Sequence, residues 1–310
     1  MAIFIMDRIA EDAVSFLRQH HEVVDFPASR ERDWKAEASA LIVRTFQVRE
    51  ADIGQAQRLK IVAKHGSGVD NIDIAAAIRK GIMVTNTPGA NADAVAEYVL
   101  ALALTTARRV AMSDRFLRGG IPGQAQDGIE LGGKTLGLIG LGDIGSKTGR
   151  LFKSAFSAQV IAYDPYAPKS AFEQCGARQL ADIATVLREA DVISLHVPLL
   201  DSTRHLIGAD ELNMMKPTAI LVNAARGGIV DESALHAALS TGRIAGAASD
   251  VFEAEPPPSS HPLLSLDTFV GSPHIAGSSR EALRRMGFGA ARAVLAALAG
   301  DIPAHVLNTH

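Results

Sequence analysis

The feature that most constrains the fold of this chain is a glycine loop set between a strand, a helix and a second strand. The hexamer Gly140-Leu141-Gly142-Asp143-Ile144-Gly145 follows the apolar run Thr135–Ile139 and leads into a helix-compatible stretch, Ile144–Phe156. Gln159–Tyr163 is then predicted to be a strand, and Asp164 follows it, nineteen residues after the last glycine (164 − 145 = 19). This order of strand, loop, helix, strand and acid is typical of a dinucleotide-binding site.

Each glycine of the loop has a separate physical role in such a site. Gly140 permits the tight turn, Gly142 lets the backbone approach a pyrophosphate, and Gly145 allows close packing of helix on strand. The helix N-terminus offers N–H groups and a positive dipole end to the phosphates. Asp143 and Ile144 stand in the loop where it enters that helix.

Asp164 predicts which dinucleotide is bound. A carboxylate here accepts hydrogen bonds from both ribose hydroxyls and would repel a 2′-phosphate, so NAD is expected rather than NADP. The alternative is a glycine-rich turn in a strand–helix–strand unit followed by a helix-capping aspartate. The complete motif context favours the nucleotide site.

Composition excludes several classes of function. The 310 residues are 47% hydrophobic and 21% charged, and the net charge is −3 without a block of like charges. A nucleic-acid partner or an anionic membrane surface therefore has no electrostatic support. The candidate helix Val95–Ala107 contains Glu97 and is too short to span a bilayer.

Two further observations favour a cytoplasmic location. Cys175 is the single cysteine, so an internal disulfide is impossible, and inert packing is its expected role. The N-terminal Met1–Asp7 has no basic region before a long apolar stretch, and it is predicted to be a first strand instead of a signal peptide. We expect no metal site.

Two rounds of strand and helix alternation predict an α/β fold with two Rossmann-like doubly wound parallel sheets. The first round has expected strands at Ala2–Met6, Glu22–Asp25, Ala40–Arg44, Leu59–Ala63 and Ile82–Thr85, and expected helices at Asp12–His20 and Asp73–Lys80. The second has six expected strands, at Thr135–Ile139, Gln159–Tyr163, Val192–Leu195, Ala219–Val222, Ala245–Ser249 and Phe269–Gly271. Its expected helices are Ile144–Ala155, Ile183–Ala190, Ala209–Met214 and Ser233–Thr241.

Two helical segments bracket the second round and predict that it is inserted into the first. These segments are Ala94–Phe116, followed by a loop at residues 118–123, and the alanine-rich Arg280–Leu298. The expected plan is a flavodoxin-like substrate domain of residues 1–97 and 285–310. A nucleotide-binding Rossmann domain of residues 98–284 would lie between its two segments.

Three chemically capable side chains follow three consecutive expected strands. Arg226 follows the fourth strand of the second round, Glu255 the fifth and His274 the sixth. Ligands of open parallel sheets bind beyond the carboxyl ends of the strands, so these residues are expected to converge beside the nicotinamide.

These residue types suit hydride transfer to a 2-keto acid. Arg226 can bind the carboxylate and the carbonyl oxygen, and a protonated His274 can donate to the developing alkoxide. Glu255 can hold the other imidazole nitrogen and favour the imidazolium. Taken singly, the arginine could cap a strand end, the glutamate could be a solvated loop carboxylate, and the histidine could be structural. His196, at another strand end, is the rival histidine.

The chain resembles the D-2-hydroxyacid dehydrogenase family, in particular its phosphoglycerate dehydrogenase-like branch. The resemblance covers nearly the whole chain. It rests on Val43-Arg44-Thr45, residues 66–73 (GSGVDNID), Asn86-Thr87-Pro88, the glycine loop, His196-Val197-Pro198-Leu199, residues 223–231 (NAARGGIVD), Asp250-Val251-Phe252 and Pro273-His274-Ile275-Ala276-Gly277.

The resemblance implies roles for individual residues. The catalytic arginine, glutamate and histidine of the family fall on Arg226, Glu255 and His274, and its carboxamide-binding aspartate falls on Asp250. The pyrophosphate-loop positions of the family fall on Asp143 and Ile144. Further NAD contacts fall on Val197, Ala224, Ala225 and Gly277. The turn Gly66-Ser67-Gly68 matches the loop whose backbone N–H groups hold the substrate carboxylate, which makes Ser67 and Gly68 substrate-binding residues.

Two departures from the family pattern bear on stability and on substrate. Gly149 lies inside the helix after the glycine loop, where a larger residue is usual, and should cost roughly 1 kcal/mol relative to alanine. Lys64 stands where phosphoglycerate-using members carry arginine, which weakens the case for that substrate. Arg44 and Lys64 together could still pair with a remote phosphate or sulfonate.

The sequence as a whole predicts an NAD-dependent D-2-hydroxyacid dehydrogenase that acts on a small 2-keto or 2-hydroxy acid. One alternative is D-3-phosphoglycerate dehydrogenase activity. An alternative of another class is a non-catalytic NAD(H)-sensing interaction protein on the same fold, as in related corepressors. The sequence gives neither the substrate side chain nor the physiological direction.

The segment Val95–Leu104 bears on assembly because it is apolar on nearly every face. One interpretation is a helix buried between the two domains. The other is a helix that packs on its own chain and on a two-fold mate. The family resemblance favours a homodimer through the nucleotide domain, with the loop Arg115–Glu130 reaching the partner.

Overall fold

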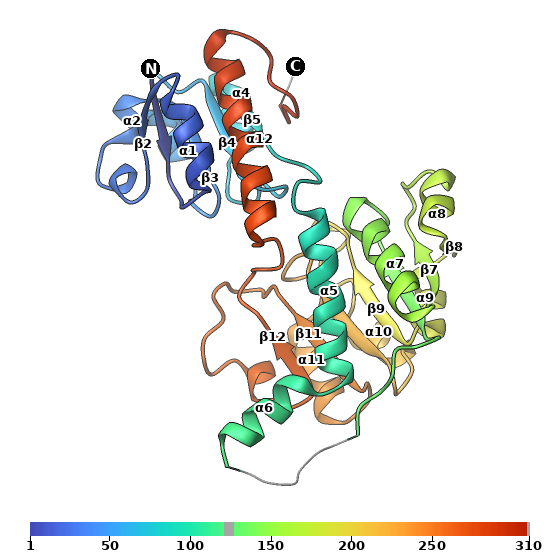
Figure 1. The fold of residues 1–310 in the computed structure, drawn as a ribbon. Coiled ribbons are helices and arrows are strands. Elements are labelled where there is room, and N and C mark those ends of the chain that lie inside the picture. The colour runs from blue at the N-terminus through green and yellow to red at the C-terminus, as the bar shows by residue number, and fades with distance from the viewer. Residues whose placement is uncertain (121–126, 309–310) are drawn as a thin grey trace. The chain divides into compact units, whose positions relative to one another are not determined.

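The computed structural model describes residues 1–120 and 127–308. The chain divides into two compact units, which are considered separately below. The terminal unit is made of Met1–Asn91 together with the segment that starts at Ser278, and the central unit is Ala92–Gly277. The chain therefore leaves the terminal unit, forms the whole central unit and then returns (Figure 1).

The terminal unit is built around a five-stranded parallel sheet of order β2-β1-β3-β4-β5. Its strands are β1 (Ala2–Ile5), β2 (Glu22–Val24), β3 (Ala38–Val43), β4 (Ile61–Lys64) and β5 (Met83–Thr85). Its helices are α1 (Glu11–Arg18), η1 (Ala28–Arg30), α2 (Trp34–Glu37), α3 (Glu50–Gln55), α4 (Ile74–Lys80) and α12 (Arg280–Ala299).

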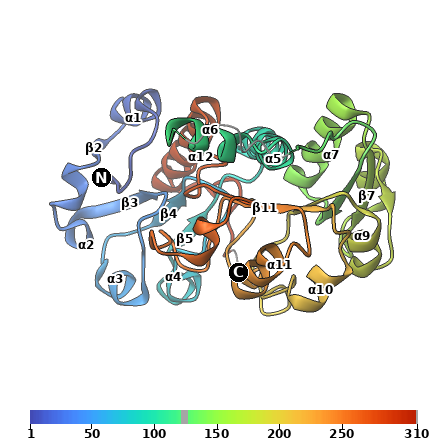
Figure 2. The same ribbon diagram turned by 90° about the horizontal axis from the view of Figure 1, so that it is seen from below.

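Both faces of this sheet are buried under helices. Ile3 and Ile5 of β1 point to the face covered by α1 and α12, whereas Phe4 and Met6 point to the face covered by α2, α3 and α4 (Figure 2). Successive side chains of a strand alternate between faces, so a strand buried on both sides must be apolar throughout. This explains the short continuous apolar runs in the sequence.

The central unit has a seven-stranded parallel sheet of order β12-β11-β10-β9-β6-β7-β8. Its strands are β6 (Thr135–Ile139), β7 (Gln159–Tyr163), β8 (Arg178–Gln179), β9 (Val192–Leu195), β10 (Ile220–Asn223), β11 (Gly246–Ser249) and β12 (Phe269–Gly271). Its helices are α5 (Ala92–Ala107), α6 (Val110–Arg118), α7 (Asp143–Phe156), α8 (Lys169–Cys175), α9 (Ile183–Glu189), α10 (Ala209–Met214), α11 (Glu232–Ser240) and η2 (Pro262–Ser265).

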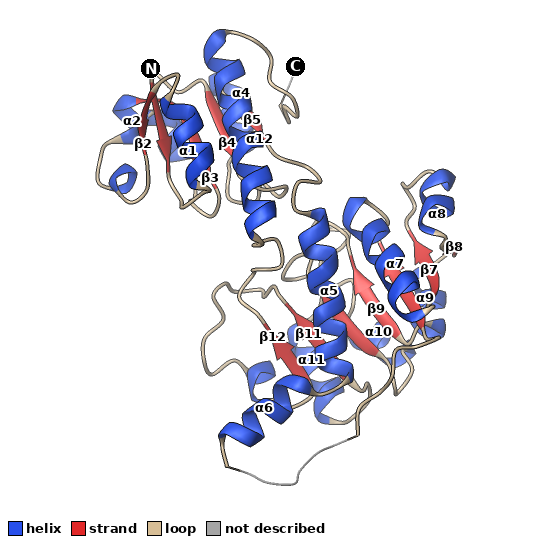
Figure 3. Cartoon of the chain, viewed as in Figure 1, coloured by secondary structure: helices blue, strands red, loops and turns tan. Residues whose placement is uncertain are grey.

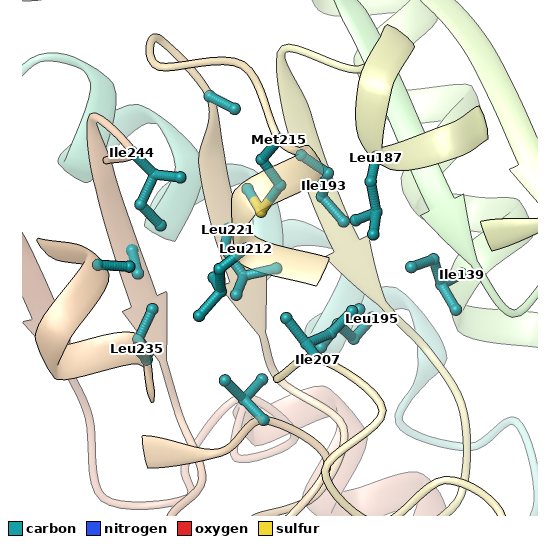
Figure 4. Close-up of a cluster of buried hydrophobic side chains, with 14 of the residues drawn as sticks. Ile139, Leu187, Ile193, Leu195, Ile207, Leu212, Met215, Leu221, Leu235 and Ile244 are labelled. Atoms are coloured by element: carbon teal, nitrogen blue, oxygen red, sulfur yellow. The ribbon is translucent and has the colours of Figure 1, made fainter. Parts of the chain in front are cut away.

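Helices cover both faces of the central sheet as well (Figure 3). One hydrophobic cluster joins the sheet to α5, α7 and α8, and a second joins it to α9, α10 and α11. In the second cluster Leu212 and Met215 pack toward Ile193 and Leu221 (Figure 4). The large buried clusters hold the strand ends in a fixed register.

The strand order places the ligand-binding edge of the central unit. The chain runs outward from β6 through β7 to β8, and then crosses back to β9 on the other side of β6. The direction in which successive strands are added therefore reverses between β6 and β9. Open α/β sheets bind their ligands at this point, beyond the carboxyl ends of the strands. The glycine loop leaves β6 at this edge.

The structure corrects several expectations about secondary structure. The segment Ala94–Phe116, predicted as one helix, forms α5 and α6, because Arg109 has a left-handed backbone (φ 53°) that breaks the helix. The elements α8 and β8 were not predicted, and no bounds were predicted for α2 and α3. The units divide at Asn91 and at Ser278, a few residues before the expected boundaries, because α5 belongs wholly to the central unit and α12 wholly to the terminal one.

None of the helices in residues 1–120 and 127–308 is both long enough and apolar enough to span a bilayer.

Candidate active site

The glycine loop of the central unit has the geometry that its sequence predicts. Gly140 has φ 96°, and a Cβ there would lie 2.5 Å from the carbonyl oxygen of His196. A Cβ on Gly145 would lie 2.4 Å from the carbonyl oxygen of Gly140. Both contacts are too short for any side chain, so these two positions require glycine.

Gly142 differs because a Cβ there would meet nothing within 4 Å. It is the N-cap residue of α7, and no side chain caps the N–H groups of this helix end among the described residues. Open space in front of uncapped N–H groups at a helix N-terminus fits a bound pyrophosphate. Asp143 and Ile144 are the first two residues of α7, which begins one residue before the expected start at Ile144.

Asp164 follows β7 and is tied to the glycine loop. Its Oδ2 accepts a hydrogen bond from the Leu141 N–H at 2.7 Å, and its Oδ1 accepts from the N–H groups of Tyr166 (2.8 Å) and Ala167 (3.1 Å). A carboxylate has about four acceptor positions, so about one remains for a ribose hydroxyl. The loop-bracing role of Asp164 was not predicted.

Asp250 shapes the turn that carries His274. Its carboxylate is buried and accepts hydrogen bonds from the Ser272 hydroxyl (2.7 Å) and from the N–H groups of Ile275 (2.9 Å) and Ala276 (2.7 Å). Its carbonyl oxygen accepts from the His274 N–H at 2.7 Å. Asp250 therefore fixes the backbone around His274, in addition to the nicotinamide contact that the resemblance implies.

The remaining predicted NAD residues lie on the carboxyl side of central strands. Val197 comes after β9 and packs beside Gly140, Ala224 and Ala225 follow β10, and Gly277 ends the central unit after β12. These residues and the glycine loop therefore lie at the same edge of the sheet, where the carboxyl ends of the strands meet.

His274 and Glu255 form a hydrogen-bonded pair. His274 Nδ1 lies 2.8 Å from Glu255 Oε2, and the His274 side chain is 50% exposed. An ionised carboxylate only accepts hydrogen bonds, so Nδ1 donates to Glu255 and Nε2 is the ring nitrogen outside this pair. Among the described residues, no hydrogen bond engages that Nε2.

The surroundings of Glu255 keep it ionised. Burial raises the pKa of Glu255, but the hydrogen bonds from His274 and from the Phe252 N–H, with the nearby charge of Arg226, outweigh burial and hold the pKa below its ordinary value. The carboxylate is therefore charged at neutral pH and can stabilise an imidazolium on His274.

Arg226 lies in a braced turn after β10. Its Nη1 donates to the carbonyl oxygen of Ala225 at 2.6 Å, and its own carbonyl oxygen accepts from Asn223 Nδ2 at 2.9 Å. Gly227, the next residue, lies against the Phe252–Glu253 backbone, and the charge of Arg226 helps to lower the pKa of Glu255. Arg226 is therefore close to the Glu255–His274 pair.

His196 is a poor candidate for the proton donor. Its Nε2 lies 2.9 Å from the Ser194 hydroxyl, and burial lowers the pKa of His196 to about 4. The ring is therefore neutral at physiological pH and supplies no imidazolium. Its carbonyl packs against Gly140, so His196 supports the glycine loop.

The terminal unit contains the predicted anion-binding turn at Ser67 and Gly68. Asn86 Nδ2 donates to the Ser67 carbonyl at 2.7 Å, and the Ser67 hydroxyl contacts Asn91 Oδ1 at 3.2 Å. Within the described residues, neither the Ser67 N–H nor the Gly68 N–H donates a hydrogen bond. Two such N–H groups in one turn are suited to a carboxylate.

Arg44 and Lys64, also in the terminal unit, are engaged with neighbouring groups. Lys64 Nζ donates to the carbonyl oxygen of Arg44 at 2.6 Å and also to Asn71 Oδ1. Arg44 Nη2 donates to the hydroxyl of Ser278 at 2.6 Å.

Asp7 organises the turn after Val43, and sequence reasoning missed it. Its carboxylate accepts hydrogen bonds from the N–H groups of Arg44 (2.7 Å), Thr45 (3.0 Å) and Phe46 (3.0 Å), and from the Thr45 hydroxyl (2.9 Å). An aspartate at the end of a first strand has no local sequence signal for this role, because its partners are distant along the chain.

In the part of the chain that the structure describes, no group of three or more His, Cys, Asp or Glu side chains is arranged to hold a metal ion.

Comparison with known families agrees with this geometry. The model of the family described as "D-isomer specific 2-hydroxyacid dehydrogenase, NAD binding domain" matches residues 100–276. These residues lie in the central unit and include the glycine loop, Arg226, Glu255 and His274. The chain belongs to this family. The central unit is its NAD-binding domain.

Relatives of this family member span more than one activity. A glyoxylate reductase from Aeropyrum pernix is 40% identical over 99% of this chain and 95% of its own length. A D-3-phosphoglycerate dehydrogenase from Methanocaldococcus jannaschii is 42% identical over 99% of this chain, which spans only 59% of that protein. A D-lactate dehydrogenase from Aquifex aeolicus, solved with NAD and lactic acid, superposes with a TM-score of 0.85 at 27% identity and full coverage of both chains.

Proposed function

We propose that this protein is an NAD-dependent D-2-hydroxyacid dehydrogenase that transfers a hydride between NAD(H) and C2 of a small 2-keto or 2-hydroxy acid. One observation carries the proposal: His274 is paired to an ionised Glu255 through Nδ1 at 2.8 Å, and no hydrogen bond among the described residues engages its Nε2. The pair lies beside Arg226 in a domain whose family binds NAD.

The residues of the central unit fit NAD(H). Gly142 and the first turn of α7 would hold the pyrophosphate, and Asp164 the ribose. Asp250, Val197, Ala224, Ala225 and Gly277 would form the nicotinamide end of the site. The cofactor, when bound, supplies or accepts the hydride.

His274, Glu255 and Arg226 would perform the proton transfer and the positioning. In reduction, protonated His274 donates from Nε2 to the alkoxide that develops at C2, while Glu255 stabilises the imidazolium. Arg226 binds the substrate carboxylate and carbonyl oxygen through its planar guanidinium. In oxidation, neutral His274 accepts the hydroxyl proton at the same nitrogen.

Small substrates are favoured over phosphoglycerate. Lys64 Nζ already donates to the Arg44 carbonyl and to Asn71, and Arg44 donates to Ser278, so a remote phosphate would have to compete with these contacts. The unengaged N–H groups of Ser67 and Gly68 instead suit the carboxylate that all 2-keto acids share. D-3-phosphoglycerate dehydrogenase activity is the second candidate, because one relative of 42% identity has that name.

A substrate panel tests the proposed function. NADH oxidation would be measured with glyoxylate, hydroxypyruvate, pyruvate, phenylpyruvate and 3-phosphohydroxypyruvate, and then repeated with NADPH on the best acid. We expect turnover of one or more unphosphorylated acids and a higher kcat/KM with NADH, because a 2′-phosphate would meet the Asp164 carboxylate.

The other outcomes identify the alternatives. A preference for 3-phosphohydroxypyruvate would establish the second candidate. A protein that binds NADH but turns over none of the five acids would be an NAD(H)-sensing interaction protein. A preference for NADPH would contradict the role of Asp164.

We also propose a cytoplasmic homodimer. On α6, Val110 and Leu117 are exposed, and on the preceding helix α5, Tyr98, Leu100 and Leu104 are only half-buried where they pack on the core of the central unit. These apolar residues support a two-fold mate packed on this side of the central unit. Part of the loop expected to reach the partner, residues 121–126, lies outside the described residues.

A further inference from the structure

The loop that carries Glu255 is held at both ends by one side chain. Glu232, in the first turn of α11, accepts a hydrogen bond at Oε1 from the Glu253 N–H (2.8 Å). Its Oε2 lies 2.9 Å from His261 Nε2. Both side chains of this Glu232–His261 pair are less than 20% exposed. Glu232 thus joins the start and the end of residues 253–261.

The backbone at Phe252 and Glu253 also lies in close contact with the loop that carries Arg226. A Cβ on Gly227 would lie 1.8 Å from the carbonyl oxygen of Phe252, 2.2 Å from its carbonyl carbon and 2.8 Å from the Glu253 nitrogen. The Phe252–Glu253 peptide therefore lies directly on Gly227. Its N–H points to Glu232, so the peptide is fixed from two directions.

The preceding peptide along the chain, Val251–Phe252, shares residue Phe252 with the Phe252–Glu253 peptide and is hydrogen-bonded to Glu255. The Phe252 N–H donates to Glu255 Oε1 at 3.1 Å, and Glu255 Oε2 holds His274. The Phe252 ring also packs edge-on against the His261 ring, with centroids 5.5 Å apart. A shift of the peptide would therefore move Glu255 relative to both Arg226 and His274.

We propose that Glu232 and Gly227 are positioning residues that hold the Phe252–Glu253 peptide, and with it Glu255, at its contact distance from His274. This inference rests on the proposed function for its catalytic consequence. Glu232 acts through the backbone and has no contact with His274. Besides Glu255 and His274 themselves, Arg226 is the charged group that acts on this pair. The Glu253 carboxylate instead contacts His205 Nε2 at 3.1 Å.

The test compares Glu232→Ala with a conservative variant and a matched control. In Glu232→Gln the amide oxygen can still accept from the Glu253 N–H, so most of the positioning is retained. Glu211 is the matched control, because it also lies in the first turn of a helix, α10, and accepts from a backbone N–H, that of Gly208 at 3.0 Å. Its contacts do not involve the loop that carries Glu255. Gly227→Ala is a second variant whose folding must be checked first.

The readouts are the pH profile of kcat for reduction and the KM for NADH. For Glu232→Ala we expect a fall in kcat of about tenfold, because an ångström-scale misplacement of a catalytic group can cost up to about 100-fold. The alkaline limb of the pH profile of this variant should move to lower pH, and its KM for NADH should not change. In Glu232→Gln, kcat should fall less than in Glu232→Ala. Glu211→Ala should keep the wild-type kcat and pH profile.

An NMR titration of the His274 ring in nitrogen-labelled protein gives a readout that needs no turnover. If the wild type reduces no acid of the panel, the proposed function fails, and this titration still decides the positioning role. In Glu232→Ala the ring should lose its proton at a lower pH than in wild type. An unchanged titration, or an equal change in Glu211→Ala, would overturn the inference.

Discussion

His274 performs its proposed chemistry from an unusual backbone conformation. Its φ of 54° lies in the left-handed region, which residues other than glycine seldom adopt. Asp250 compensates by accepting hydrogen bonds from the groups around this turn. The strained conformation is therefore stabilised by the buried carboxylate of Asp250, which has no direct part in the proposed proton transfer.

Replacement of His274 by alanine tests the proton donor. His274→Ala should lower kcat for reduction by about 10²–10⁴-fold, because the alkoxide loses its acid. NADH binding, followed by fluorescence, should be unchanged, since the glycine loop and Asp164 are intact. A loss of less than about tenfold would assign the proton to another group.

Glu255→Gln tests the pair through its pH dependence. The glutamine keeps the size of the side chain but has no charge to stabilise the imidazolium. The proton on His274 is then lost at a lower pH, so the alkaline limb of the reduction profile should move downward. A limb that stays at its wild-type position would contradict the pairing.

Asp7→Asn tests the carboxylate that orders the turn after Val43. Burial raises the pKa of Asp7, but hydrogen bonds from Arg44, Phe46 and Thr45 outweigh it and lower the pKa below its ordinary value. A lowered folded-state pKa stabilises the fold above the unfolded pKa of about 3.9, and this stabilisation is lost as the pH falls through the folded pKa. We expect a loss of about 2 kcal/mol at pH 7 that shrinks in acid.

Trp34 makes this measurement specific, because the only tryptophan of the chain lies buried in the terminal unit. Its fluorescence in urea follows that unit alone. Asp73→Asn is the control, since Asp73 caps α4 through the Ala76 N–H and asparagine caps a helix about equally well. Equal stability of Asp7→Asn and wild type at pH 7 would contradict the expectation.

The sequence was sufficient to predict that Arg226, Glu255 and His274 follow three neighbouring parallel strands, β10, β11 and β12, whose loops meet at one edge. Their catalytic roles stay a prediction. It was not sufficient for Asp7 or Glu232. Each acts on backbone N–H groups that are brought close only by the tertiary fold, 37 residues away for Arg44 and 21 for Glu253.

At the scale of elements, Gly149 shows how packing overrides helix propensity. Propensity alone predicts that alanine would stabilise α7 by roughly 1 kcal/mol. In the structure, a Cβ on Gly149 would lie 2.4 Å from Cys175 Sγ, so α7 and α8 approach closely at this glycine. Cys175 is buried, and burial raises the pKa of its thiol, in agreement with an inert packing role.

A double-mutant cycle tests this contact. Gly149→Ala should destabilise the protein by about 1 kcal/mol, because the clash outweighs the gain in propensity. Cys175→Ala alone should also destabilise, by loss of packed sulfur, but the double variant should lose about 1 kcal/mol less than the sum. Urea unfolding followed by circular dichroism gives the values. Strict additivity would mean that the two residues do not meet.

Other elements had weak local signals. The two-residue β8 and the four-residue α2 are too short for a periodic pattern. The break at Arg109 lies in a sequence that favours a continuing helix, since neither glycine nor proline marks it.

At the scale of the whole molecule, the proposed homodimer is testable by light scattering at micromolar concentration. A mass near 32.7 kDa would mean a monomer and defeat the proposal, whereas twice that mass would support it. Leu117→Asp, on α6, should weaken a dimer. Ile302→Asp, a similarly exposed apolar residue of the terminal unit, should leave it intact.

The two-segment origin of the terminal unit constrains the order in which a nascent chain can fold. Ile3, Ile5, Val14 and Leu17 are buried against α12, a helix that the ribosome makes more than two hundred residues later. The central unit is complete in translation before α12 emerges. An apolar face of the first strands therefore remains exposed until α12 is made. Chaperone binding during synthesis should concentrate on these early segments.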